Sequence, residues 1–324
     1  MTGARVPWTA LLAVGAFLLT FAGLLRFQVY ESVLVLPLEQ NRTYRMTAQN
    51  GTYFDTGTLV TRAGVPLVST TTLRGDVGAG REDVAVWMEF TSLDTGGGRR
   101  IDYHERRTAF DRRTGLAVDC CGGYVDGDAR PRQTGLAFRL PFRAEPRSYP
   151  MYDTVLHREV LLRFEREEDI RGVRTYRYGY TLGPVRVEET PMEFPGRALG
   201  LPERRTVGAA RYAEVTRTLW VEPESGLTVK AEERHRQTLR TADGAERRVS
   251  LQADLVMSPE DTASAIAEAQ AFVRWTLAVR DVLPGALCML AAALGLLAVR
   301  LRGPGPAGRR PAGQQVQTAE TETV

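Results

Sequence analysis

Two uncharged apolar runs lie near the ends of this chain, at Val6–Leu25 and Val282–Val299. A helix needs about 20 apolar residues to cross about 30 Å of hydrocarbon, and each run is close to that length. No charged residue interrupts either run, so neither has the amphipathic pattern of a core helix in a soluble protein. The runs therefore predict two transmembrane helices, with the residues between them on one side of the membrane.

The arginines beside these runs indicate the orientation. Positive residues are retained on the cytoplasmic side of a span. Most of the flanking arginines lie between a run and the nearer end of the chain: Arg5 before the first run, and Arg300, Arg302, Arg309 and Arg310 after the second. On the flanks that face the middle of the chain, only Arg26 directly follows the first run. We therefore expect an inner (cell) membrane protein with both termini cytoplasmic and an extracytoplasmic middle. A cleavable signal peptide is the alternative for the first run.

The residues between the runs are rich in β-branched and aromatic side chains, with glycine turns between short segments. Examples are 57–61, 65–73, 84–90, 160–165, 173–182 and 227–239. This pattern predicts a mainly β ectodomain of curved antiparallel sheets over residues 38–257. Ser258-Pro259-Glu260-Asp261 is a helix start. It predicts a juxtamembrane helix over 258–281, which we expect to pair with a helical stalk over 26–37.

These predictions divide the chain into consecutive parts. They are a cytoplasmic tail at 1–5, transmembrane helices at 6–25 and 282–299 with the stalk, ectodomain and juxtamembrane helix between them, and a disordered cytoplasmic tail at 300–324. The net charge of +3 is too small to indicate a nucleic-acid partner. Membrane lipids are the expected partners.

One internal repeat is visible. Phe110–Val118 and Val221–Val229 both read as a strand, a polar turn with glycine, and a second strand. Two explanations stay open: two β-hairpins that share one turn chemistry, or a duplicated β-unit that makes two curved sheets or a partly open barrel.

Cys120 and Cys121 are adjacent, immediately before a glycine pair. Their Cα atoms are about 3.8 Å apart across a trans peptide, below the usual disulfide range, so a bond between them would be a strained vicinal disulfide. A structural clamp, two free thiols, and a redox or metal role are the alternatives. Cys288 lies inside the second apolar run, where it fills space as a small apolar residue.

The sequence contains no constellation that carries catalysis. Its three histidines, His104, His157 and His235, lack metal-ligand spacing and read as solvated residues. No nucleophile elbow, phosphate loop or zinc-protease motif occurs. We therefore expect a non-enzymatic protein with no catalytic residue, no cofactor and no metal site.

The central stretch Gly135–Asp153 contains Gly-Leu, then Leu140-Pro141-Phe142, then Tyr149, Tyr152 and Asp153. With Asp111–Gly115, Cys120–Gly122, Ile170–Tyr176, Phe194–Leu201 and both apolar runs, it resembles the actinobacterial PorA-type porin family, long carried as a domain of unknown function. The resemblance covers nearly the whole chain and implies a cell-envelope protein with an unassigned or porin-like role.

Two further expectations concern ligands. The two-span topology is similar to that of scavenger receptors that pass lipids through a β-rich ectodomain, so a lipid-handling ectodomain is the alternative function, with an envelope lipid as ligand. A homo-oligomer would be needed for a pore, because charged strands and helical anchors do not suit a conventional outer-membrane barrel. Tyr149, Tyr152 and Asp153 form the candidate cluster, either a tyrosine–aspartate hydrogen bond that locks a loop or a ligand-facing group.

Overall fold

The computed structural model describes residues 7–302 except 189 and 203–204. The tail expected at 1–5, and all but three residues of the one expected at 300–324, lie outside the described residues. The chain divides into two compact units, one formed by Met1–Glu31 with Leu277–Val324, the other by Ser32–Thr276.

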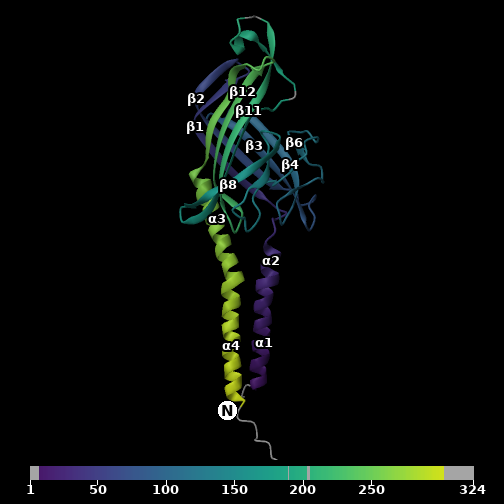
Figure 1. The fold of residues 1–324 in the computed structure, drawn as a ribbon, viewed down its shortest axis with the longest axis vertical. Helices are drawn as coiled ribbons and strands as arrows, with labels where there is room; N and C mark the ends of the chain where they lie inside the picture. The colour runs from purple at the N-terminus through teal and green to yellow at the C-terminus, as the bar shows by residue number, and fades with distance from the viewer. Residues whose placement is uncertain (1–6, 189, 203–204, 303–324) are drawn as a thin grey trace, which may run out of the picture. The chain divides into compact units, whose positions relative to one another are not determined.

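The first unit is a pair of apolar helices. Its elements are α1 (Trp8–Leu24), η1 (Leu25–Val29), the start of α2 (Tyr30–Val33), η3 (Ala278–Val282) and α4 (Leu283–Leu301). Figure 1 shows α1 and α4 side by side. Gly15 faces the Ala291 carbonyl, while Nη1 of Arg26 lies 2.7 Å from Oδ1 of Asp281, so the two helices run antiparallel. Small residues at such contacts let backbones approach closely.

Both helices are long and apolar enough to cross a membrane. They extend over Trp8–Val33 and Pro259–Leu301, and the most apolar 18-residue segment of each has a mean hydropathy of 2.0 and 2.3, respectively. Large apolar side chains on them are exposed, including Phe17, Met289 and Val299. This arrangement matches the length and composition of the two spans expected from the sequence.

The stalk follows the expectation only at its base, where Arg26 pairs with Asp281 at 2.7 Å. The first helix ends at Val33, and the following residues belong to the β-rich unit: Leu36 is buried beside Trp87 and Phe110, and the Pro37 carbonyl accepts a hydrogen bond from the Trp87 indole at 3.1 Å. In α3 (Pro259–Leu277), Ala265, Ile266 and Ala269 are buried in the core of the sheet. The first half of the apolar stripe of α3 therefore packs in the core of the sheet, while Leu277 at its end is exposed.

Thirteen strands form one antiparallel sheet within the described residues. They are β1 (Asn41–Asp55), β2 (Val60–Gly75), β3 (Val84–Thr95), β4 (Arg100–Asp111), β5 (Ala117–Val118), β6 (Tyr124–Val125), β7 (Tyr149–Asp153), β8 (Arg158–Ile170), β9 (Val173–Arg186), β10 (Met192–Pro195), β11 (Thr206–Glu222), β12 (Leu227–Thr241) and β13 (Glu246–Met257). The main order is β5-β4-β3-β2-β1-β13-β12-β11-β9-β8-β7, with β10 on β11 and β6 on β4. A short helical turn, η2 (Gly196–Leu199), follows β10.

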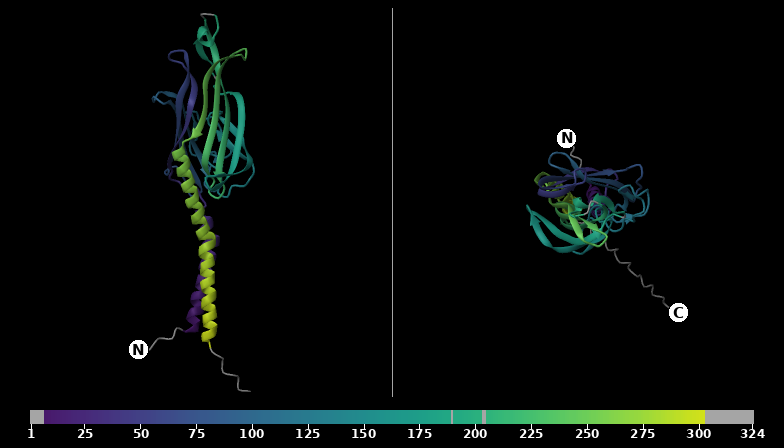
Figure 2. Two further views of the ribbon diagram at one scale, coloured as in Figure 1. Left: turned by 90° about the vertical axis from the view of Figure 1, so that its left-hand side faces the viewer. Right: turned by 90° about the horizontal axis from the view of Figure 1, so that it is seen from above.

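The sheet is strongly curled. In Figure 2, the purple and blue strands β1–β4 face the green and teal strands β8–β13 across an interior. Exposed and buried residues alternate along β13, where Gln252 and Asp254 are exposed and Leu251, Ala253 and Leu255 are buried. The outer surface of this strand is thus mostly polar and the inner one apolar.

Leu136 joins the two edges of this curled sheet. It forms one bridge to Leu116, beside the edge strand β5, and another to Met151 in the edge strand β7. The Ala117 N–H donates to the Gly135 carbonyl at 2.8 Å, and the Leu136 N–H donates to the Pro150 carbonyl at 2.7 Å. The central stretch therefore closes the sheet into a ring at this level, which leaves no free edge there.

The two repeated turns have the same chemistry. Asp111 accepts the backbone N–H groups of Arg113 and Thr114, and Glu222 accepts those of Glu224 and Ser225. Each turn ends in a glycine of positive φ, +72° at Gly115 and +69° at Gly226. The internal similarity noted in the sequence thus corresponds to two equivalent turns, which link β4 to β5 and β11 to β12.

Candidate functional site

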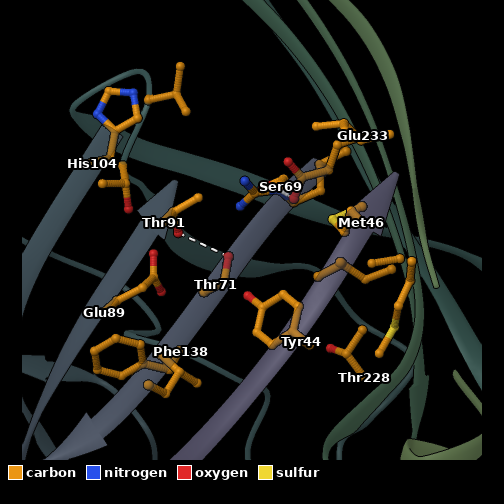
Figure 3. A pocket seen from close by; sticks show the side chains of 18 of the residues that line it. Tyr44, Met46, Ser69, Thr71, Glu89, Thr91, His104, Phe138, Thr228 and Glu233 are labelled. Atoms are coloured by element: carbon orange, nitrogen blue, oxygen red, sulfur yellow. Dashed lines mark hydrogen bonds and ion pairs between the residues drawn. The ribbon is translucent and has the colours of Figure 1, made fainter. Parts of the chain in front are cut away.

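A cavity of about 180 Å³ lies inside the curled sheet. Strands from both sides contribute to it, and Figure 3 shows Tyr44, Thr71, Thr91 and Glu89 lining it on neighbouring strands. Apolar side chains such as Met46, Leu93 and Leu255 line other parts. The acidic, basic and histidine side chains that line it are Arg42, Glu89, Asp102, His104, Arg106, Arg139, Arg217, Glu233 and His235.

Arg217 is the centre of one charged network in the wall. Its Nε atom lies 2.7 Å from Oε1 of Glu233, and its Nη1 atom lies 3.5 Å from Oδ2 of Asp153. His235 lies on the other side of Glu233, with its Nε2 atom 2.8 Å from Oε2. Burial alone would raise the pKa of Glu233, but the neighbouring Arg217 and His235 lower it to about 2. Glu233 is therefore ionised inside the protein.

Arg106 is the centre of a second network. It is 3% exposed, and its Nη2 atom donates to Oε2 of Glu89 at 2.9 Å and to the Ala137 carbonyl at 2.7 Å. Its Nε and Nη1 atoms are buried and have no hydrogen-bond partner among the described residues. The Nε atom of Arg139 is also buried and has no hydrogen-bond partner among the described residues. Burial lowers the pKa of the Arg139 guanidinium to about 10. Buried donors without partners are costly, so this wall is suited to accept a hydrogen-bond acceptor from solution.

The candidate cluster from the sequence lies beside the cavity, on β7. Asp153 is fully buried and accepts hydrogen bonds from the Leu156 N–H at 2.8 Å and from the Tyr180 hydroxyl. The Tyr149 hydroxyl instead accepts from the Glu145 N–H at 2.9 Å, and the Tyr152 hydroxyl has no partner among the described residues. The tyrosine that bonds Asp153 is thus Tyr180, which lies on β9 and could not be identified from sequence spacing. None of Tyr149, Tyr152 and Asp153 is among the residues that line the cavity.

The histidines differ from the solvated residues expected. His235 is 8% exposed, and the His104 side chain is 16% exposed. His104 and His157 meet at one carboxylate oxygen: Oδ2 of Asp126 lies 2.9 Å from Nδ1 of His104 and 3.0 Å from Nε2 of His157. Sequence spacing gave no signal for this group, because the partners of Asp126 are 22 and 31 positions away.

Asp102 and Asp126 control the charge of His104. Nε2 of His104 lies 3.5 Å from Oδ2 of Asp102. Burial lowers the pKa of His104, but the two carboxylates outweigh it and raise this pKa to about 10. The pKa of Asp102 falls to about 2, because His104 and Arg211 outweigh the effect of burial. The group is therefore a compact arrangement of two imidazoles and two ionised carboxylates.

Cys120 and Cys121 are joined by a disulfide in the structure, with their Cα atoms 3.8 Å apart. The pair lies between β5 and β6, where Cys121 has a φ of +63° and Gly122 one of +72°. Cys288 is a free, exposed cysteine in α4. Neither Cys120 nor Cys121 is among the residues that line the cavity.

Comparisons with known proteins agree with the resemblance seen in the sequence. A family model described as "Porin PorA" matches residues 9–300. A curated protein named "Porin PorA" from Corynebacterium amycolatum is 28% identical over 158 residues, which span 40% of this chain and 40% of that relative. Both matches point to a porin-like protein, and they give no support to the lipid-handling alternative.

Proposed function

Because the chain belongs to the porin PorA family, we propose that it is a non-enzymatic, porin-like membrane protein whose curled sheet offers a binding chamber to small hydrophilic anions. In this proposal the two apolar helices hold the chain in the cell membrane, with both termini cytoplasmic and residues 38–257 outside. The family match supports the porin-like role, and the length and composition of the helices support the anchoring.

The observation that carries the anion preference is the pair of unpartnered donors on Arg106. A guanidinium presents its N–H groups in a planar fork that matches the oxygens of a carboxylate or phosphate. Four arginines line the cavity together with three carboxylates: Arg42, Arg106, Arg139 and Arg217 against Glu89, Asp102 and Glu233. Positive charge thus slightly exceeds negative charge in the wall, which favours anions.

The strands themselves do not have the composition of membrane-crossing strands. On β8, Glu159, Arg163 and Glu165 are exposed. On a lipid-facing surface an arginine would cost about 2–4 kcal/mol near the bilayer centre, and a glutamate would cost less. We therefore assign passage through the membrane to an assembly of several copies, in which the curled sheet receives the solute and the helices cross the bilayer.

Planar-bilayer recording on the full-length protein tests this function. We expect discrete conductance steps and an anion preference, and we expect Arg106→Gln to reduce that preference. Arg163→Gln, on the exposed side of β8, is the matched control and should leave selectivity unchanged. Absence of conductance at every protein concentration would contradict the porin-like role, and co-purified lipid in native mass spectra would favour the lipid-handling alternative.

A further inference from the structure

We propose that His104, Asp126 and His157 bind one Zn²⁺ ion per chain. One ligand atom from each of these residues, two imidazole nitrogens and a carboxylate oxygen, lies within 4.8 Å of the others. In a tetrahedral zinc site with bonds of about 2.0–2.1 Å, ligand atoms are about 3.3 Å apart. The two distances to Oδ2 of Asp126, 2.9 and 3.0 Å, need to lengthen by only a few tenths of an ångström.

The donor set selects the class of metal. Imidazole suits zinc and neighbouring transition metals, whereas Ca²⁺ and Mg²⁺ prefer sites made of oxygen ligands. Two histidines and one carboxylate are also a common protein ligand set for zinc sites in which water takes the fourth position. This site therefore fits zinc better than the hard cations.

The backbone holds the ligands in place from three separate segments. His104 lies on β4, Asp126 directly follows β6, and His157 lies in the turn between β7 and β8. The Asp126 N–H donates to the Glu105 carbonyl at 2.7 Å, and the Glu105 N–H returns a bond to Oδ1 of Asp126 at 2.8 Å. That bond leaves Oδ2 for the metal. Asp126 and His157 each have a φ of +51°, which is unusual for residues other than glycine.

Asp102 lies on the side of His104 where zinc-binding histidines usually have a supporting group. Metal-bound imidazoles generally place their other ring nitrogen beside a carboxylate, a carbonyl or water, which orients the ring. In His104 the ligand atom is Nδ1. The opposite nitrogen, Nε2, is buried without a hydrogen-bond partner among the described residues, and it lies at an ion-pair distance of 3.5 Å from Oδ2 of Asp102, which is the nearest carboxylate able to orient the ring. Gln237 and Arg211 lie in turn beside Asp102, with closest distances of 3.4 and 3.7 Å.

The site is accessible to an ion from solution. The side chains of Asp126 and His157 are 28% and 33% exposed, while that of His104 is 16% exposed and borders the cavity (Figure 3). The site would join β4, the segment after β6 and the turn after β7. Binding should therefore stabilise the fold by linkage.

Isothermal titration of the detergent-solubilised full-length protein with ZnCl₂, after treatment with EDTA, tests the proposal. We expect one Zn²⁺ per chain, a higher melting temperature that EDTA reverses, and proton release on binding. MgCl₂ should produce none of these effects. Asp102→Asn should weaken zinc binding by about 10–100-fold, and His157→Ala and Asp126→Asn should weaken it more, since they remove ligands outright.

Asp119→Asn is the matched control, because the Asp119 side chain is 78% exposed and pairs with Arg132 at 3.0 Å. It should bind zinc as the parent protein does. Circular dichroism without metal establishes that each variant is folded. If His157→Ala is not folded, His157→Gln takes its place. Absence of zinc binding by the parent protein, or equal binding by the parent and the His157 variant, would overturn the proposal.

Discussion

Arg217 and Glu233 are direct neighbours across β11 and β12, and they form an ion pair of 2.7 Å in the wall of the cavity. Their side chains are 17% and 15% exposed, so water screens this pair only weakly. The pair also connects Asp153 on one side to His235 on the other. A network of charged side chains therefore lines the cavity at this position.

Removing one member of this pair should destabilise the protein strongly. We expect Glu233→Gln to lower the free energy of unfolding by about 3–5 kcal/mol, because Arg217 would keep a buried and poorly compensated charge. Glu232→Gln is the control, since the Glu232 side chain is 44% exposed beside Lys230, and it should change stability by less than about 0.5 kcal/mol. Urea denaturation followed by circular dichroism measures both values, and equal stabilities would contradict this account.

Gly135 should not tolerate even alanine. Its φ is +73°, and an added Cβ would lie 2.7 Å from the Pro150 carbonyl group, at the place where the edges of the sheet meet. Gly172→Ala is the matched control, with a φ of +81° and open space around the added Cβ. The control should cost about 1–2 kcal/mol from backbone strain alone. Gly135→Ala should cost clearly more in a denaturant titration, and a similar cost for both would show that the closure is dispensable.

Tyr180 and Tyr149 should differ in their contribution to stability. Tyr180→Phe removes a hydrogen bond to the buried Asp153 carboxylate and should cost about 1.5–3 kcal/mol. Tyr149→Phe removes a bond to a neutral backbone N–H and should cost only about 0.5–1.5 kcal/mol. Asp153→Ala should lower the melting temperature further than either. A larger fall in melting temperature for Tyr149→Phe than for Tyr180→Phe would contradict this account.

His104 should make stability depend on pH in the alkaline range. Its pKa rises from 6.5 to about 10 in the folded protein, where it faces Asp102, Asp126 and His157, with Arg211 behind Asp102. The stabilisation is therefore complete below about pH 6.5 and is lost as the pH rises through about 10.

Denaturation at about pH 6 and about pH 9 in EDTA measures this dependence. The parent protein should be less stable at the higher pH, and His104→Asn should reduce the difference. The pKa of Asp102, about 2, adds a loss of stability only in strong acid, well outside this interval. An unchanged difference in the His104 variant would contradict the assignment of the alkaline effect to this imidazole.

Much of the fold could be predicted because it depends on local patterns. The strand patterns at 160–165 and 173–182, the glycine turns after Asp111 and Glu222, and the Ser258 helix start are each specified within a few residues. The candidate sites were less predictable. His104 and Asp126 carry no recognisable spacing, and Asp153 was assigned the wrong tyrosines because its partner lies 27 positions away on β9.

By itself, the sequence determined the two long apolar helices and the β-rich middle, because length, periodicity and turn chemistry are properties of short segments. Its motifs also carried the resemblance to the porin PorA family, which the family model confirms. Only the tertiary structure decided that Leu136 closes the sheet, that α3 buries Ala265, Ile266 and Ala269 in the core of that sheet, and that two histidines meet at Asp126. Strand order and curl place residues from distant segments at one point, and no local pattern records which residues will meet there.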